Sequence, residues 1–332
     1  MTRVLRRTSI AVATLAALLL GTLAGIPSAA ATSSPIVASW RLEAGNYDLQ
    51  PGLGAMWAVN TDLFHYGPLY RIDPATDSIR TVTTMPFPAG GMAVAFDSLW
   101  VTDYYGNAVW RFAPDGSVLA VFPTGLQPER IHAAFGSIWS SDHHGGSLTR
   151  IDPATSTVVG TVPVGQQHMF RNGPQDFTAD STRVYVGSSN LVKLQSVDPT
   201  TDAVATPSHR AGGDAFCGDL RAIAGSVWSS DPCSQAAYRL GTDGTAQQVF
   251  DASPGEVTSL TVLDRQVWIG RERHVDPDTG AGSQGVLDER NAHTGALLRT
   301  VVIEGDPQFV RGGYGDLWVF DARRHSVLRV AV

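Results

Sequence analysis

The sequence has 332 residues, of which 43% are hydrophobic and 17% are charged, and its formal net charge at pH 7 is −7. Its basic residues are almost all arginine, with Lys193 as the single lysine, and they form no block of like charge. An acidic chain without a basic stripe binds nucleic acid poorly, so we expect no nucleic-acid partner.

The first 31 residues have the three parts of a secretory signal. Three arginines precede an apolar run over residues 10–26, and a stretch of small residues ends at Ala31. The run contains threonines and glycines, and it is shorter than the roughly 20 strongly apolar residues of a membrane anchor. We therefore expect cleavage of residues 1–31 and a secreted mature chain, 32–332, without a transmembrane segment. No cysteine lies near Ala31 to carry a lipid, and export by the general secretory or the twin-arginine route is compatible with the sequence.

Tryptophan recurs at a nearly regular interval in similar strings, such as DSLWVTD around Trp100 and GSIWSSD around Trp139. The 261 residues from the first of these anchors to the last divide into six intervals with a mean of 43.5, which is typical of one four-stranded blade per repeat. The pattern predicts an all-β fold, a single seven-bladed β-propeller over residues 32–332. The seven anchors are Trp57, Trp100, Trp139, Tyr185, Trp228, Trp268 and Trp318.

Two strands are predicted after each anchor and one before it. Alternating segments such as LYRIDPATDSIRTV from Leu69 are interrupted by Asp-Pro or Asp-Gly, which favours a hairpin of two outer strands. A short apolar run, such as AVAF from Ala93, precedes each anchor and supplies the innermost strand. No long segment of the mature chain has the 3.6-residue period of a helix.

The two ends of the mature chain are expected to close the ring together. The last repeat stops one strand short of a blade, while PIVASWRL precedes the first repeat. We therefore expect residues 36–42 to pair with residues 326–332 as the outermost strand of the last blade. Such closure protects sheet edges that would otherwise be exposed.

The only two cysteines lie in the fifth repeat. Cys217 and Cys233 are each eight residues from Gly225, the centre of the hairpin between the inner strand and the Trp228 strand. They should therefore face each other, and in an oxidising compartment this arrangement favours a disulfide with a structural role.

Ligand binding is predicted on the face where the loops leading into the inner strands lie beside the loops that follow the tryptophan strands. We call this the top face, and propellers usually bind ligands there, around the central channel. Converging polar side chains could hold a small polar molecule, a glycan or a protein; alternatively, they bond neighbouring loops and line a water-filled channel. The predicted ligand-binding residues are Tyr47, Asp48, Glu129, Arg130, Gln175, Asp176, Asp219 and Gln308.

An acid or amide recurs three residues after most anchors. A residue repeated in most blades is better suited to capping a loop than to catalysis at one point, so we interpret this set as structural. Its members are Asn60, Asp103, Asp142, Asp231 and Asp321.

The candidate metal-ligating and catalytic residues lie where the sequence departs from the repeat. His143 and His144 follow Asp142, and His168 lies in a lengthened connection; imidazoles beside carboxylates can hold a metal or relay protons. Adjacent residues of a strand point in opposite directions, so at most one of the first two would join a shared site. The sixth blade has a long insertion after its anchor that contains Glu272 and His274, which we take as candidate catalytic residues.

The repeat resembles that of virginiamycin B lyase-like and YVTN-type propellers. TRIDPATSTVVGTVPVG from Thr149 and LWVTD from Leu99 carry the resemblance, which extends over essentially the whole mature chain. It implies a seven-bladed ring that opens a cyclic depsipeptide by elimination, with magnesium held by glutamates and a histidine as base. Glu272 is similar to the family's metal glutamate. Gln308 and Thr258 occupy the positions of the family's Pro-His histidines.

Three functions follow as expectations. The first is a secreted, monomeric binding or interaction module. The alternative is a metal-assisted lyase or hydrolase that uses a divalent cation, magnesium or calcium; a structural protein of the cell envelope is a third. For the enzyme, the candidate side chains are Glu129, Asp176, Glu272 and one of His144, His168 or His274.

Overall fold

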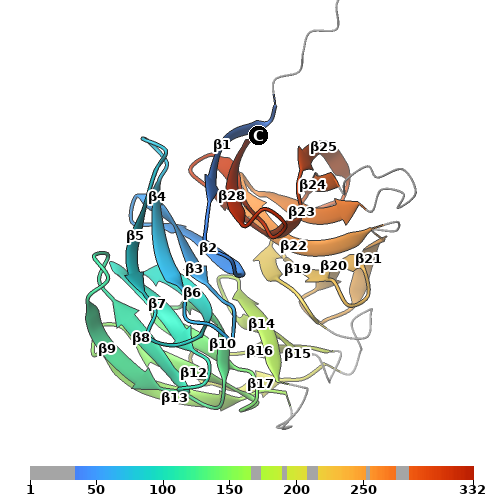
Figure 1. The fold of residues 1–332 in the computed structure, drawn as a ribbon. Coiled ribbons are helices and arrows are strands. Elements are labelled where there is room, and N and C mark those ends of the chain that lie inside the picture. The colour runs from blue at the N-terminus through green and yellow to red at the C-terminus, as the bar shows by residue number, and fades with distance from the viewer. Residues whose placement is uncertain (1–33, 166–172, 189–192, 208–215, 252–254, 274–283) are drawn as a thin grey trace, which may run out of the picture. The chain divides into compact units, whose positions relative to one another are not determined.

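The computed structural model describes residues 34–165, 173–188, 193–207, 216–251, 255–273 and 284–332. The expected signal segment and two candidate residues, His168 and His274, lie outside these ranges. The described residues from Pro35 onward form one compact unit of seven four-stranded antiparallel sheets, arranged in a ring (Figure 1). The prediction of an all-β, seven-bladed propeller is confirmed. Within the described residues, no helix has the length and apolarity needed to span a membrane.

The first four blades take up the chain from Tyr47 to Ala205, and each runs from its inner to its outer strand. Blade 1 contains β2 (Tyr47–Gly52), β3 (Ala55–Asn60), β4 (Pro68–Asp73) and β5 (Ser78–Thr84). Blade 2 contains β6 (Ala89–Ala95), β7 (Ser98–Asp103), β8 (Ala108–Phe112) and β9 (Val118–Pro123). Blade 3 contains β10 (Pro128–Ala134), β11 (Ser137–Asp142), β12 (Ser147–Asp152) and β13 (Thr157–Pro163). Blade 4 contains β14 (Pro174–Ala179), β15 (Val184–Ser188), β16 (Lys193–Val197) and β17 (Val204–Ala205).

The last three blades follow the same order until the ring closes. Blade 5 contains β18 (Leu220–Ile223), β19 (Ser226–Asp231), β20 (Ala236–Gly241) and β21 (Ala246–Asp251). Blade 6 contains β22 (Glu256–Leu263), β23 (Gln266–Arg273), β24 (Gln284–Asn291) and β25 (Leu297–Glu304). Blade 7 contains β26 (Pro307–Gly313), β27 (Asp316–Asp321) and β28 (Ser326–Ala331), and β1 (Ile36–Arg41) from the start of the chain completes it.

The anchor tryptophans fix the inner hairpin of most blades. Trp100 is fully buried, and its indole Nε1 donates to the carbonyl of Ala95 at 3.0 Å, across the turn between β6 and β7. The guanidinium of Arg111, on the next strand, lies 4.9 Å from the ring centroid of Trp100. Trp139 and Trp318 repeat both contacts, with Arg150 and Arg329 respectively. This shared contact set explains why a Trp and an Arg recur at fixed positions in the sequence.

The closure predicted for the two ends of the chain is confirmed. β1 pairs antiparallel with β28, with Trp40 opposite Val327. The ring of Trp40 stacks on that of Trp318 with centroids 5.4 Å apart, and its Nε1 donates to the carbonyl of Asp77 at 2.7 Å. The first strand therefore joins the last blade to the first.

The predicted disulfide is also present. Cys217 and Cys233 are bonded, with their Cα atoms 5.9 Å apart. Gly225 lies at the hairpin between them with φ of +71°, a left-handed conformation that favours glycine. The bond ties the chain before β18 to the loop after β19.

Candidate functional site

Side chains at the top of the axis link several neighbouring blades. An inner strand has no sheet partner on its axial edge, so its backbone N–H groups need acceptors from elsewhere. Asp48 Oδ2 accepts from the Met92 N–H at 3.1 Å, and Asp176 Oδ2 accepts from the Leu220 N–H at 2.8 Å. In the next blades Asp219 Oδ2 accepts from the Leu260 N–H at 3.2 Å, and Ser259 Oγ accepts from the Val310 N–H at 3.2 Å. Three predicted ligand-binding carboxylates thus hold blades together.

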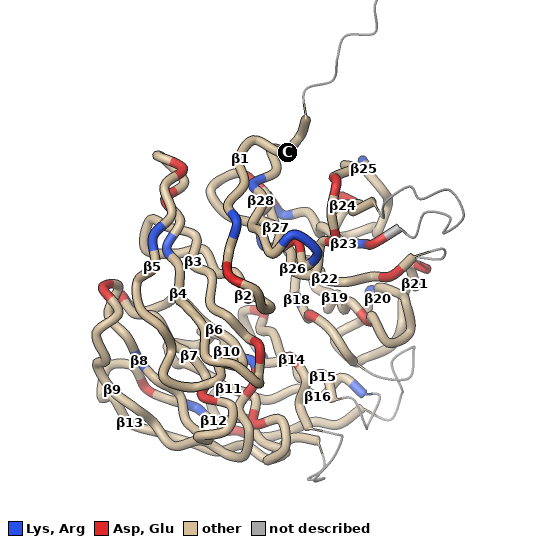
Figure 2. The backbone as a smooth tube through the Cα atoms, in the orientation of Figure 1, with Lys and Arg blue, Asp and Glu red and all other residues tan. Residues whose placement is uncertain are grey.

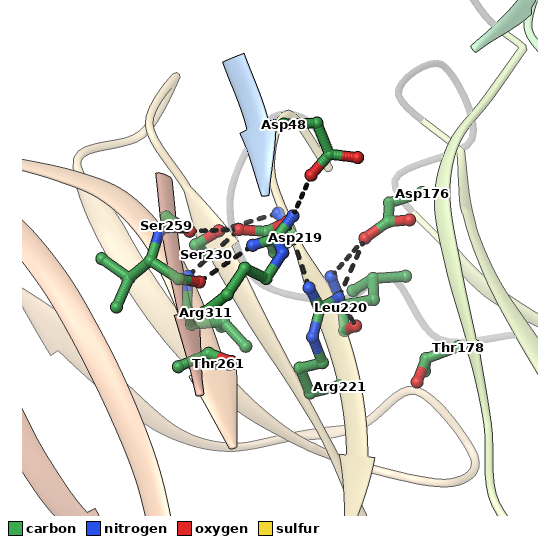
Figure 3. A network of polar contacts seen from close by, with 12 residues as sticks. Asp48, Asp176, Thr178, Asp219, Leu220, Arg221, Ser230, Ser259, Thr261 and Arg311 are labelled. Carbon is green, nitrogen blue, oxygen red and sulfur yellow. Dashed lines mark hydrogen bonds and ion pairs between the residues drawn. The ribbon is translucent and has the colours of Figure 1, made fainter. Parts of the chain in front are cut away.

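Two arginines fill the space beneath these carboxylates (Figure 3). One amine of Arg311 lies 3.2 Å from Asp48 Oδ1 and 3.3 Å from Asp219 Oδ1. Arg221 lies 3.5 Å from both Asp176 and Asp219. Burial alone would raise the pKa of Asp219, but the guanidiniums of Arg311 and Arg221 outweigh it and hold that pKa well below its ordinary value.

Inward-facing residues of the inner strands lie at two levels along the axis. The residues nine positions before each anchor form what we call the upper ring, and those seven positions before form the lower ring. The upper ring is Asp48, Gly91, Arg130, Asp176, Asp219, Ser259 and Phe309. The lower ring is Gln50, Ala93, His132, Thr178, Arg221, Thr261 and Arg311.

A separate pocket lies at each end of the axis. The top pocket has a volume of about 250 Å³ and is lined by Glu129, Arg130, Gln308 and Phe309 among others. The bottom pocket, of about 310 Å³, lies where the inner strands end, and six of the seven lower-ring residues line it. No residue lines both pockets. The upper ring and its arginine partners lie between them.

Arg130 is the exceptional cation of the axis. Its guanidinium carbon lies 5.7 Å from the ring centroid of Phe309, and within the described residues the guanidinium makes no hydrogen bond or ion pair. Burial would lower the pKa of Arg130, but the carboxylates of Glu129, Asp176, Asp219 and Asp48 raise it, so the group stays charged. A charged donor without a direct partner is available to a ligand in the top pocket.

The other predicted ligand-binding residues divide between the pocket and the core. Gln308 lines the top pocket, and its Nε2 donates to Asp306 Oδ1 at 2.9 Å. Tyr47 is fully buried against Tyr70 and Phe320, and burial raises its pKa above the ordinary value. Gln175 is half-buried at the start of β14. A ligand-binding role for these side chains stays a prediction.

The candidate enzyme residues that the structure describes have separate partners. The carboxylate of Glu272, a buried residue, contacts the Arg323 guanidinium. His143 Nδ1 lies 3.6 Å from Glu129 Oε2, beside the top pocket, and its ring centroid is 4.9 Å from that of His144. Among the described residues, the one convergent group of three possible metal ligands is Cys217, Asp231 and Cys233, and both of its sulfurs are in the disulfide. The described residues thus contain no group of three acidic or histidine side chains that would fit the magnesium site implied by the lyase resemblance.

The acids and amide that follow the anchors cap loops, as predicted. Four of the five accept hydrogen bonds from the loop after their strand. The acceptor–donor pairs are Asn60 with the Asp62 N–H, Asp103 with the Gly106 N–H, Asp231 with the Ser234 N–H and Asp321 with the Arg323 N–H. Asp142 accepts instead from the hydroxyls of Ser147 at 2.6 Å and Thr149 at 2.8 Å.

Replacing Asp142 by asparagine should flatten the pH dependence of stability. Burial raises the pKa of Asp142 from 3.8 to about 6, so the folded state favours the protonated form. Stability from this group is fully present below about pH 4 and is lost as the pH rises through 6, a change of about 3 kcal/mol. In Asp142→Asn, the difference in unfolding free energy between pH 4 and pH 7 should shift by most of that amount, about 2 kcal/mol, because the unfolded carboxyl is already partly ionised at pH 4. Urea denaturation at both pH values measures it, with Asp264→Asn in an exposed turn as control. Equal pH dependence in the two variants would contradict the assignment.

Fold and axis together define the chain as a seven-bladed β-propeller with a buried ion network between two pockets. No protein-family model and no curated protein sequence matches it. Among solved structures, virginiamycin B lyase from Staphylococcus aureus is similar, with a TM-score of 0.69 and 12% identity over 89% of this chain and 98% of the lyase. BamB from Moraxella catarrhalis is similar with a TM-score of 0.60 and 14% identity, over 90% of this chain and 97% of BamB. The WD40 repeats of RRP9 are similar with a TM-score of 0.70 and 11% identity, over 90% of this chain and 98% of the RRP9 chain. The resemblance to virginiamycin B lyase is therefore confirmed for the fold.

Proposed function

We propose that the protein is a secreted binding module that holds the polar group of a small molecule, glycan or protein in the top pocket. The observation that carries this proposal is the Arg130 guanidinium, which is charged, stacked against Phe309 and without a direct partner among the described residues. Glu129 lines the same pocket, so a ligand could contact a donor and an acceptor together. The disulfide is compatible with secretion.

Exposed aromatic side chains near the pocket support a larger partner. Leu63 lines the top pocket, and its neighbours Phe64 and Tyr66 are 83% and 66% exposed. Tyr105, in the corresponding loop of blade 2, is 51% exposed. Exposed aromatic residues are enriched where proteins contact other molecules. Acidic and basic residues are interspersed along the strands and loops of the blades (Figure 2).

The test is a binding screen that depends on Arg130. Purified protein is screened by thermal shift and calorimetry against sugar acids, neutral oligosaccharides, amino acids and short peptides. We expect at least one hit whose affinity falls at least tenfold in Arg130→Ala, because a charge-assisted hydrogen bond is lost. Arg80→Ala, on the exposed face of β5, removes the same charge elsewhere and serves as the control. Hits that bind Arg130→Ala as well as the unchanged protein, or no hit at all, would contradict the proposal.

A lyase or hydrolase is the second candidate, and the closeness of His143 and Glu129 favours it. A histidine beside a carboxylate can act as a base at neutral pH. In this case a cyclic depsipeptide or lactone would be opened by the protein, and His143→Ala would abolish turnover while leaving binding within about threefold. If the protein binds such a compound without opening it, the enzyme is excluded for that compound and the binding module is retained as the proposed function.

A further inference from the structure

The charges of the two axial rings are separated along the axis. The upper ring contains three carboxylates and one guanidinium, whereas the lower ring contains Arg221 and Arg311 and no carboxylate. In the ion pairs between the two rings, the carboxylates belong to the upper ring and the guanidiniums to the lower ring (Figure 3). The positive charge therefore lies on the side of the bottom pocket, which Arg221 and Arg311 both line. The field along the axis therefore favours an anion at the bottom end.

Several hydrogen-bond donors around the bottom pocket have no acceptor among the described residues. Arg311 is 5% exposed, and its buried Nε has no partner. The hydroxyl oxygens of Thr178 and Thr261 accept from the backbone N–H groups of Ala222 and Gly312, and the described residues show no acceptor for the hydroxyl hydrogens. A ligand rich in acceptors would satisfy these donors.

Apart from Gln50 and His132, the remaining wall of the bottom pocket is apolar. Phe177, Pro51 and Val262 line it beside the alanines of β10, Ala133 and Ala134. A pocket with donors at the base and apolar walls fits a ligand with one charged end and a compact hydrocarbon body.

We propose that the bottom pocket is a second binding site, which takes a small carboxylate with an apolar body. The carboxylate lies toward Arg221 and Arg311, with the lower-ring hydroxyls as further donors, and the hydrocarbon part packs against Phe177. This site lies at the opposite end of the axis from the top pocket and does not depend on the function proposed above.

A matched pair of probes and a matched pair of variants test this site. Benzoate and the nearly isosteric, neutral benzamide are titrated into the purified protein by calorimetry. Ala133 is exposed and lines the bottom pocket, so Ala133→Glu places a carboxylate at its mouth, and Ala133→Gln adds the same bulk without charge. We expect benzoate to bind at least tenfold more tightly than benzamide, and Ala133→Glu to bind benzoate at least tenfold more weakly than Ala133→Gln.

Three outcomes would overturn the proposal. Equal affinity for benzoate and benzamide would remove the role of the charge. Equal affinity of the two Ala133 variants for benzoate would place the ligand elsewhere. Loss of benzoate binding in Arg130→Ala, with binding kept in Ala133→Glu, would assign the ligand to the top pocket. Both Ala133 variants carry the change at an exposed position, and far-ultraviolet circular dichroism confirms that each is folded before titration.

Discussion

Replacement of Trp40 by alanine should lower the free energy of unfolding by about 3–5 kcal/mol, the usual cost of removing a buried aromatic ring. Trp40 is 8% exposed, stacks on Trp318 and donates to the Asp77 carbonyl of blade 1. The substitution therefore weakens the last blade and its junction with the first together. Urea denaturation followed by circular dichroism measures the change.

Val37→Ala is the matched control for this prediction. Val37 lies on the same strand, but it is 55% exposed, so its truncation should change stability by less than about 0.5 kcal/mol. If Trp40→Ala lowered the free energy of unfolding no more than Val37→Ala, the pairing of β1 with β28 would contribute little to stability. Closure of the ring by the two ends of the chain would then not explain the stability of the fold.

The blades could be predicted from the sequence because each is specified locally. The anchor tryptophan, its carbonyl acceptor five residues earlier and the arginine of the next strand all lie within one repeat, as Trp100, Ala95 and Arg111 illustrate. Closure was predictable for a related reason, since a missing strand at one end matched a surplus strand at the other. Neither inference required knowledge of contacts between distant repeats.

The axis could be predicted only in part, because its contacts join distant segments. Arg311 and Asp48 are 263 positions apart, and no local pattern pairs them. In blades 1, 3 and 4 the prediction names two adjacent residues, although strand alternation turns one of them away, as it does Tyr47 next to Asp48. Glu129 and Arg130 both line the top pocket, and the register of β10 shifts at this point, between Pro128 and Ile131.

The lower ring was missed although its signal was present. Arg221 follows Asp219 by two positions, and His132 follows Arg130 by two, so the alternation of side chains that selects the upper ring also selects the lower. His132 Nε2 lies 2.9 Å from Asp176 Oδ1 of the next blade. The residues seven positions before each anchor define the lower ring in the same way as those nine positions before define the upper ring, so the sequence already contains both rings and the separation of charge between them.

Replacement of Asp219 by asparagine should be as destabilising as the loss of Trp40, at about 3–5 kcal/mol, because the buried guanidiniums of Arg221 and Arg311 lose the carboxylate that they share and keep one counter-charge each. Asp219 is 4% exposed, contacts Arg221 and Arg311, and accepts from the Ser259 hydroxyl at 2.5 Å. Since the folded state holds the pKa of Asp219 below its ordinary value, this stability is present above about pH 4 and is lost as the pH falls further. The asparagine variant should therefore show its full deficit at pH 7 and a smaller one at pH 3 in urea denaturation.

A double variant separates the missing charge from the missing hydrogen bonds. Arg311→Met alone leaves Asp48 and Asp219 underpaired and should also cost about 3–5 kcal/mol. In Asp219→Asn with Arg311→Met the network loses one charge of each sign, so the combined cost should be smaller than the sum of the single costs by about 1–3 kcal/mol. Strict additivity would mean that the two groups do not interact, and the stability of the axis would then rest on the bonds from Asp219 to Ser259 and the Leu260 N–H alone.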